Sequence, residues 1–153
     1  MSNTFSQIHI QCVFAVKYRQ SLIEEPWKIE LEKYITSIVQ NGGHKMIAIN
    51  SLPDHIHMFF GLRPSQSISD MMETVKGDTS KWINRKRLTR GKFNWQEGYG
   101  AFSYSRSQVP IVAQYVYDQQ EHHKKISFLD EYRGLLKEFE IEFDDRYIFK
   151  VPI

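Results

Sequence analysis

Cysteine is scarce in this chain, which has one among 153 residues. Cys12 therefore cannot form an internal disulfide, and its place in an alternating apolar segment favours a role in core packing. The absence of paired cysteines argues against a structural zinc protein, and we also disfavour a histidine-rich metal-storage protein. The N-terminus lacks the basic-then-apolar pattern of a secretory signal, so we expect a protein of the reducing cytoplasm.

Long apolar runs are also missing. No stretch approaches the roughly 20 apolar residues that cross a bilayer, so we expect no membrane partner. The sequence has no glycine-rich nucleotide-binding loop, no internal repeat and no low-complexity linker. Its apolar content of 41% and aromatic content of 14% argue against disorder. We therefore expect one domain over residues 1–153, large enough to bury a core.

Acidic residues are nearly absent between positions 76 and 92. This stretch carries one acid, Asp78, and seven bases: Lys76, Lys81, Arg85, Lys86, Arg87, Arg90 and Lys92. Its formal charge is +6 in a chain whose net charge is +2, so the remainder is −4. A solvated helix end would also be basic, but it usually contains interspersed Glu and Asp. We favour a polyanion partner, with the phosphates of nucleic acid contacted by these seven side chains.

The pattern of apolar residues predicts an α+β fold. Strands are expected at 8–14, 45–50, within 52–61, and at 98–105, with a short edge strand at 147–151. Helices are expected from Pro26 to about Asn41, from Ser67 into the basic stretch, from Ser107 and Pro110 to about Lys125, and from Ser127 through Phe139. The order β-α-β-β-α-β indicates a ferredoxin-like or RRM-like antiparallel sheet with helices packed on one face, plus a C-terminal helical extension.

Two histidines lie in the strand predicted within residues 52–61. Because side chains alternate between the faces of a strand, His55 and His57 project together, while Ile56 and Met58 point the other way. Two imidazoles on one face, roughly 6–7 Å apart, can bind one divalent ion if other ligands arrive from elsewhere. The alternative is a polar strand face whose histidines bond to water or carboxylates.

The helix predicted from about residue 107 to 125 has an unusual polar stripe. Tyr115 and Gln119 are one turn apart and share a face, and His122 and His123 fall on or beside that face one turn further on. Tyr117 is about 200° from Tyr115, so the two phenols cannot serve one site. The alternative is a half-buried core tyrosine beside a solvated glutamine.

Three segments together resemble a known family. They are Pro53-Asp54-His55-Ile56-His57, then Trp95 followed by Gly98-Tyr99-Gly100-Ala101-Phe102-Ser103, and finally Tyr115-x-x-x-Gln119-x-x-His122-His123. In this order they resemble the small single-tyrosine HUH transposases of bacterial insertion sequences, the IS200-like family. The resemblance runs from the first strand to the third helix, and the last thirty or so residues match no motif. Asp118 stands where relatives often have asparagine, but it faces away from Tyr115.

The resemblance implies a metal-dependent DNA transposase that cuts single-stranded, hairpin-bearing element ends and rejoins them through a 5′-phosphotyrosine. It implies Tyr115 as the nucleophile and a metal held by His55, His57 and Gln119, with His122 and His123 in support. It further implies a homodimer whose active site is shared between subunits. Two imidazoles and an amide oxygen suit Mg²⁺ or Mn²⁺ in use, although imidazoles also accept Ni²⁺, Co²⁺ or Zn²⁺.

Two other functions fit parts of the sequence. One is a non-catalytic RRM-like module that binds single-stranded nucleic acid, although such modules carry aromatic residues where this strand has histidines. The other is a domesticated relative that cleaves chromosomal repeat hairpins with the same site residues.

Overall fold

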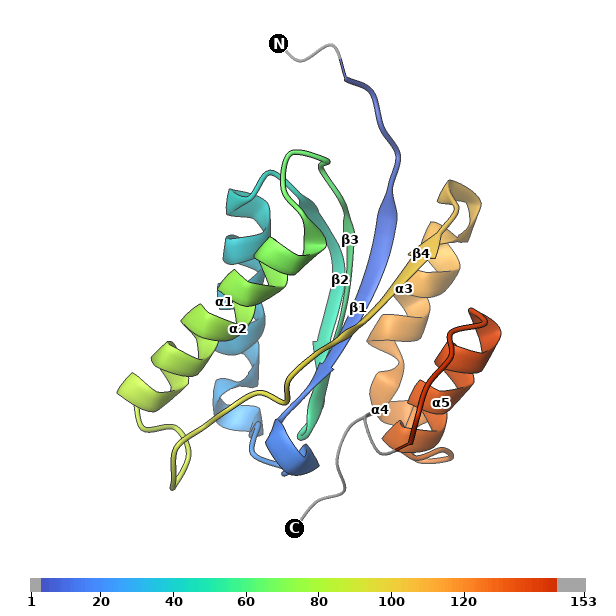
Figure 1. Ribbon diagram of the computed structural model, residues 1–153. Coiled ribbons are helices and arrows are strands. Elements are labelled where there is room, and N and C mark those ends of the chain that lie inside the picture. The colour runs from blue at the N-terminus through green and yellow to red at the C-terminus, as the bar shows by residue number, and fades with distance from the viewer. Residues whose placement is uncertain (1–3, 146–153) are drawn as a thin grey trace.

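A computed structural model describes residues 4–145 of the chain (Figure 1). It contains four strands, β1 His9–Ala15, β2 Lys45–Ser51, β3 His55–Gly61 and β4 Gly100–Tyr104. The α-helices are α1 Glu25–Asn41, α2 Ile68–Arg85, α3 Val109–Tyr117, α4 Gln119–His122 and α5 Phe128–Glu138. Two short 3-10 helices, η1 Lys17–Arg19 and η2 Arg106–Gln108, complete these elements.

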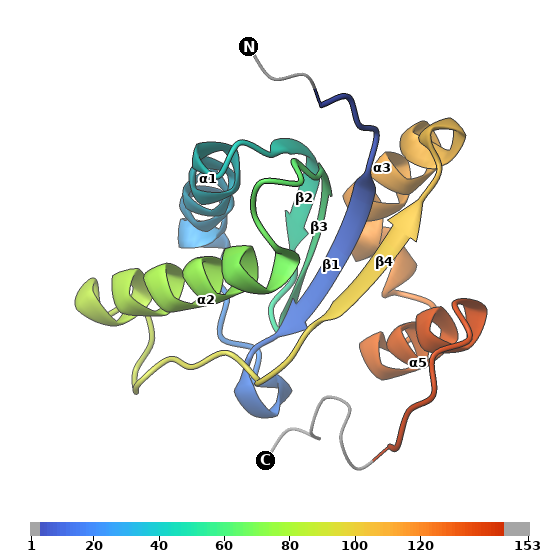
Figure 2. The ribbon, with the colours of Figure 1, turned by 45° about the horizontal axis from the view of Figure 1, so that its top comes forward.

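The four strands form one antiparallel sheet in the order β2-β3-β1-β4. Helices cover both of its faces: α1 and α2 lie on one, and α3, α4 and α5 on the other (Figures 1 and 2). The predicted α+β fold, with its antiparallel sheet, is therefore confirmed. The C-terminal helical extension supplies the second helical layer.

Alternation along the central strands builds the larger core. Even-numbered residues of β1 and β3 are buried against α1 and α2: Ile10, Cys12, Phe14, Ile56, Met58 and Phe60. Trp82 of α2 joins this core, stacked on Tyr34 with 5.5 Å between ring centroids. Cys12 is fully buried, which agrees with its expected packing role. The odd-numbered residues, including His55 and His57, face the other helical layer.

Two smaller cores hold that second layer. Val112 and Val116 dock α3 on Ala48 of β2 and Phe59 of β3. The apolar side of α5 packs against β1 and β4 through a set comprising Val13, Ala15, Phe102, Phe128, Tyr132, Leu135 and Leu136. These contacts fix α3 and α5 beside the histidines of β3, which are more than fifty residues away in sequence from both helices.

Helix starts agree well with the sequence pattern. Ser67 and Ser127 both accept a hydrogen bond from the backbone N–H three residues on, as expected of helix N-caps. Pro26 lies in the first turn of α1. The strand predicted at 147–151 falls outside the described residues.

The prediction of one helix that runs to about Lys125 is wrong in one respect. The helix is interrupted at Asp118, whose φ of −91° and ψ of 13° separate α3 from α4. The local bonds continue across the break, since Asp118 donates to Gln114 and His122 donates to Asp118. Tyr115 and Gln119 consequently remain on one side. Within residues 4–145, no helix combines the length and apolarity that a membrane crossing requires.

We predict that Thr79→Val will lower the free energy of unfolding by about 1–3 kcal/mol, as expected when a buried donor loses its partner. The Thr79 hydroxyl accepts the indole N–H of Trp95 at 2.9 Å in the larger core. Thr74→Val, on the exposed side of the same helix, is the control and should cost less than about 0.5 kcal/mol. Urea unfolding measures both, and equal losses would contradict the assignment.

Candidate functional site

The turn between β2 and β3 places two histidines on the face that α3–α5 cover. His55 and His57 are both buried, with 5.2 Å between ring centroids. The ring of His55 stacks on Phe128 of α5 at 3.7 Å, and its Nδ1 contacts the Asp54 carboxylate at 2.7 Å. His57 Nδ1 lies 2.8 Å from the side-chain amide of Gln11. Both rings are therefore held by neighbours on either side.

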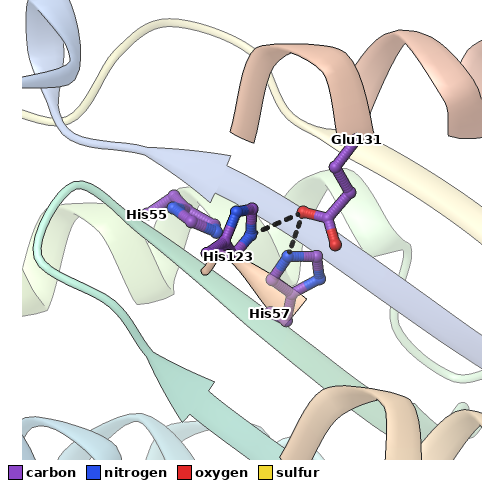
Figure 3. Close-up of side chains that lie close together, drawn as sticks. All are labelled: His55, His57, His123 and Glu131. Carbon is purple, nitrogen blue, oxygen red and sulfur yellow. Dashed lines mark hydrogen bonds and ion pairs between the residues drawn. The ribbon is translucent and has the colours of Figure 1, made fainter. Parts of the chain in front are cut away.

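A buried carboxylate from α5 lies at the centre of this site. Oε1 of Glu131 is 3.1 Å from Nε2 of His57 and 3.1 Å from Nε2 of His123 (Figure 3). Its Oε2 is 3.3 Å from Nε2 of His122. Three imidazoles from two parts of the chain thus meet one acidic side chain.

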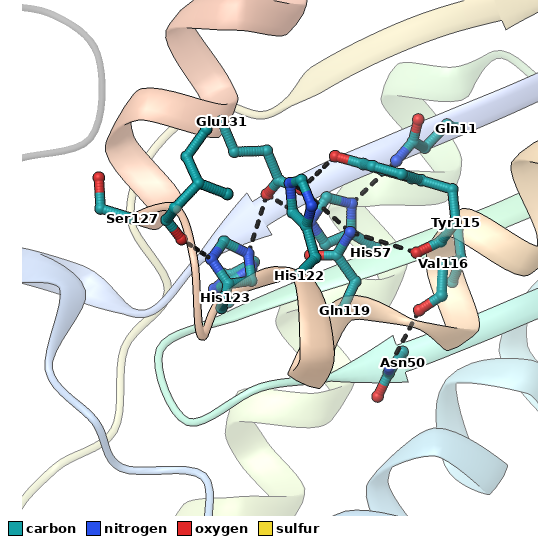
Figure 4. Close-up of polar contacts among 12 residues, drawn as sticks. Gln11, Asn50, His57, Tyr115, Val116, Gln119, His122, His123, Ser127 and Glu131 are labelled. Atoms are coloured by element: carbon teal, nitrogen blue, oxygen red, sulfur yellow. Dashed lines mark hydrogen bonds and ion pairs between the residues drawn. The ribbon is translucent and has the colours of Figure 1, made fainter.

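Tyr115 and Gln119 reach the same carboxylate from α3 and α4. The Tyr115 hydroxyl donates to Oε2 of Glu131, and Nε2 of Gln119 donates to that oxygen at 3.0 Å (Figure 4). The rings of Tyr115 and His57 are edge to face, with 5.9 Å between centroids. Tyr117 is exposed and its hydroxyl donates to the Ile47 carbonyl at 3.3 Å. The two phenols therefore point to different places, as the helical spacing predicts.

Burial and neighbouring charges shift the pKa values in this site. Burial lowers the pKa of His55 to about 4, with the hydrogen bond to Asp54 opposing it. Burial alone would raise the pKa of Glu131, but hydrogen bonds from His123 and His57 outweigh it and hold that pKa well below its usual range. Burial raises the pKa of Tyr115, and the adjacent charge of Glu131 raises it further. The resting site therefore contains a carboxylate and a protonated phenol.

The donor atoms fit a divalent metal. One nitrogen from each of His55, His57 and His123 and one oxygen of Glu131 lie within 4.8 Å of one another. Two buried polar atoms here lack a hydrogen-bond partner, Nε2 of His55 and Oε1 of Gln119. These are the atom types that ligate metals, and leaving them unpaired is unfavourable. Of the residues predicted from sequence as ligands, His55 and His57 belong to this group, and Gln119 is bonded to its Glu131 through the amide nitrogen.

The outer nitrogen of each clustered histidine also has a partner. Nδ1 of His55 contacts Asp54, Nδ1 of His57 contacts Gln11, and Nδ1 of His123 lies 2.9 Å from the Ile126 carbonyl. For His55 and His123 that partner is an acceptor, which can hold the ring proton at Nδ1 when a metal takes Nε2, the usual arrangement around metal-bound histidine. His57 differs, because the Gln11 amide nitrogen donates to its Nδ1 while Gln11 Oε1 accepts from Tyr104, which leaves the ring proton on Nε2 facing Glu131.

The basic stretch lies elsewhere. It occupies the end of α2 and the following loop, on the face of the sheet opposite to the histidines (Figure 1). Six of its bases are exposed: Lys81, Arg85, Lys86, Arg87, Arg90 and Lys92. Lys76 differs, because its ammonium donates to the carbonyls of Gln96 and Gly98. Two of the three donors of Lys76 thus hold the loop before β4, and its contact with DNA stays a prediction.

Sequence reasoning missed Glu131, and it left His123 in a supporting role. A signal for Glu131 was present: it lies three residues after Phe128 and four before Leu135, inside the apolar stripe of α5. An acidic residue in such a stripe is buried and needs partners. The partners could not be read from sequence, because they come from β3, α3 and α4.

Comparisons with known proteins agree on one family. The sequence model described as "Transposase IS200 like" matches residues 4–119. The ISDra2 transposase TnpA of Deinococcus radiodurans is 22% identical over 120 residues, which cover 75% of this chain and 86% of that protein. A crystal structure of a transposase from D. radiodurans R1 superposes with a TM-score of 0.61 and 19% identity, covering 78% of this chain and 95% of that one. The structure of a REP-associated tyrosine transposase bound to a REP hairpin superposes with a TM-score of 0.61 and 15% identity, covering 82% of this chain and 76% of that one.

We predict that the metal-free protein loses stability as the pH falls from about 8 to about 5. The pKa of His55 is about 4 when folded and about 6.5 when unfolded, so the unfolded chain takes up the proton first. The folded state should lose about 2 kcal/mol over that range from His55 alone. Glu131 acts in the same direction at lower pH, while the raised pKa of His123 favours folding at low pH.

Urea unfolding in a chelator at the two pH values measures this loss, with His55→Asn as the comparison because asparagine does not titrate. The variant should lose about 2 kcal/mol less than the unmodified protein over the same range. An identical pH dependence in both proteins would show that His55 is not held neutral by burial.

Proposed function

Since the chain belongs to the IS200-like transposase family, we propose that it cuts and rejoins single-stranded DNA at hairpin-bearing ends with Tyr115 as nucleophile. One observation carries the proposal. The Tyr115 hydroxyl, the amide of Gln119 and the imidazole of His57 all contact the same buried carboxylate. A nucleophile and a set of metal-type ligands are thus gathered at one point, which a purely structural tyrosine would not require.

The proposed reaction conserves the phosphoester. The phenol oxygen attacks phosphorus, the bond from phosphorus to the 3′ oxygen breaks, and the leaving 3′ oxygen takes up a proton. The product is a 5′-phosphotyrosine and a free 3′-hydroxyl. A 3′-hydroxyl of another DNA end then attacks the phosphorus, the bond from phosphorus to the Tyr115 oxygen breaks, and the proton of that hydroxyl returns to Tyr115 as the new phosphodiester forms. No nucleotide cofactor is needed, in agreement with the missing nucleotide-binding loop.

Tyr115 needs help to react, because its pKa is raised above its ordinary value of about 10 by burial and by the charge of Glu131. Its proton must leave as the phosphorus bond forms. His55, His57 and Gln119 are the ligands we propose for a divalent ion, Mg²⁺ or Mn²⁺. When bound, that ion would neutralise charge on the scissile phosphate.

A hollow beside Tyr115 offers an approach for DNA. It has a volume of about 430 Å³ and its lining includes Tyr115, His122, Ile111, Val112, Ile126 and Leu135. His122 is 35% exposed at this entrance, so it can contact an incoming phosphate while His55 and His57 stay buried. The apolar lining suits a base, whereas a phosphate would have to approach at His122, because the charged lining residues Asp130, Glu131 and Glu138 are acids.

We propose that the hairpin is held by the basic stretch, through Lys81, Arg85, Lys86, Arg87, Arg90 and Lys92. These cations lie across the sheet from Tyr115, so one copy presents them on a face distant from its own site. A homodimer would bring the basic face of one copy and the tyrosine site of the other to one DNA molecule. This need for two surfaces supports a dimer with a shared active site.

A non-catalytic RRM-like binder is the second candidate. It needs an open sheet face on which bases can stack. In this chain the face of β1 and β3 that bears the histidines is covered by α3 and α5, through the cores of Val112, Val116 and Phe128. That covering favours the transposase. A domesticated hairpin nuclease would use the same residues and differs only in its DNA.

We predict that incubation with a labelled single-stranded hairpin and Mn²⁺ gives a covalent protein–DNA adduct. Tyr115→Phe should abolish it, because the ring stays and the attacking oxygen is lost. Tyr117→Phe is the matched control and should retain at least about half of the adduct, since its hydroxyl contacts only the Ile47 carbonyl. Denaturing gel electrophoresis measures the adduct. If Tyr117→Phe loses the adduct and Tyr115→Phe retains it, the assignment of Tyr115 as the nucleophile is wrong.

We predict that reversing the charges of Arg85 and Lys86 to Glu weakens hairpin binding and flattens its dependence on salt. If each side chain contacts one phosphate, the slope of log affinity against log salt should fall by about 2. The control reverses Lys33 and Lys137, which are exposed and outside the basic stretch. Fluorescence anisotropy at several salt concentrations measures both. Equal changes in the two double variants would mean that only net charge matters.

A further inference from the structure

Glu131 lies outside the part of the chain that the family model matches. The family match ends at residue 119, whereas Glu131 is carried by α5, Phe128–Glu138. Its side chain nonetheless contacts five polar side chains of the site: His57, Tyr115, Gln119, His122 and His123. A carboxylate in the resting site is therefore a feature of this chain's C-terminal helix and not of the shared motifs.

The two oxygens of Glu131 face different partners. Among the residues that the structure describes, the partners of Oε1 are imidazole nitrogens, those of His57 and His123. Oε2 contacts the Tyr115 hydroxyl, the Gln119 amide and the more exposed His122. One oxygen is thus directed to the group of metal-type nitrogens, and the other to the nucleophile.

The imidazoles around Oε1 are held in place by their neighbours. His55, His57 and His123 each have a partner at Nδ1, and one nitrogen of each lies within 4.8 Å of the carboxylate oxygen. Hard cations such as Mg²⁺ and Mn²⁺ prefer a charged carboxylate oxygen to a neutral amide oxygen. On chemistry alone, Glu131 is therefore a stronger ligand for these ions than Gln119.

We propose that Glu131 is a metal ligand through Oε1 and a positioning residue for Tyr115 through Oε2, with His123 as a further ligand. This inference rests on the metal site of the proposed function and replaces its three-ligand set with one completed by α5. A carboxylate that bridges cation and phenol sets their separation, so the nucleophile is placed relative to the metal by one side chain. The C-terminal helix is then part of the catalytic machinery.

The test is calorimetric titration of the metal-free full-length chain with MnCl₂, without DNA. Glu131→Gln should weaken Mn²⁺ binding at least about tenfold, since even outer-shell partners of metals typically contribute 10–100-fold. The matched control is Glu138→Gln, the same change two turns further along α5 at an exposed position, and it should leave Mn²⁺ affinity unchanged. Thermal melting establishes that each variant is folded.

His123→Asn is the second variant, in case Glu131→Gln does not fold. It removes a ligand without removing a buried charge, and it should also weaken Mn²⁺ binding. Positioning of Tyr115 is read separately, from ¹⁹F NMR of 3-fluorotyrosine-labelled protein, with Tyr115→Phe identifying the resonance. That resonance should shift on addition of Mg²⁺ in the unmodified chain and shift less in Glu131→Gln.

Each outcome decides a different claim. Unchanged Mn²⁺ affinity in both Glu131→Gln and His123→Asn, with loss in Gln119→Ala, overturns the inference and leaves the proposed function intact. If the unmodified chain binds Mn²⁺ no better than His55→Ala, there is no metal site, and both the inference and the metal part of the proposed function fail. The Tyr115 adduct assay, which needs no knowledge of the ligand set, judges the nucleophile independently.

Discussion

The burial of one carboxylate organises the second half of this molecule. Glu131 lies on α5. It is contacted by side chains from β3, α3 and α4 and by His123, which follows α4. A charged carboxylate removed from water is tolerated only when donors surround it, and here five polar side chains do so. The requirement works in both directions, because the buried imidazoles and the phenol also need an acceptor. The packing of α5 on the sheet therefore assembles the site at the same time.

One face of the sheet bears the larger apolar core, and the other face bears the polar site. On one face, β1 and β3 contribute only apolar side chains to the core beneath α1 and α2. On the other, the same strands contribute His57 and Gln11 to a polar network, which α3 and α5 enclose with small apolar cores on either side. Gly100 allows this enclosure, because a Cβ there would lie 2.7 Å from the hydroxyl of Tyr132 on α5. A side chain on β4 at that point would have to displace the ring of Tyr132, which packs α5 against the sheet.

Local rules predicted much of this arrangement from sequence. Strand alternation placed His55 and His57 on one face, helical spacing put Tyr115 with Gln119 and away from Tyr117, and the serine caps marked two helix starts. What escaped prediction depends on contacts between distant segments. Packing between distant segments decides three of these features. They are the break at Asp118, the face of the sheet on which the basic end of α2 lies, and the approach of Glu131 to the histidines. Periodicity within a segment shows which side is buried but not what it is buried against.

The same contacts constrain how two copies could share a site. Asn50 of β2 donates to the Val116 carbonyl at 2.9 Å and to Gln120 Oε1 at 2.7 Å, so α3 and α4 are fixed to the sheet as one unit. In the dimer that we propose, an exchange of Tyr115 between copies must therefore move α3 and α4 together and rebuild the Val112–Phe59 core on the partner. Such an exchange costs little at equilibrium, because identical contacts re-form across the boundary. In such a dimer, Glu131 would link the exchanged Tyr115 to the histidines of the subunit on which Tyr115 packs.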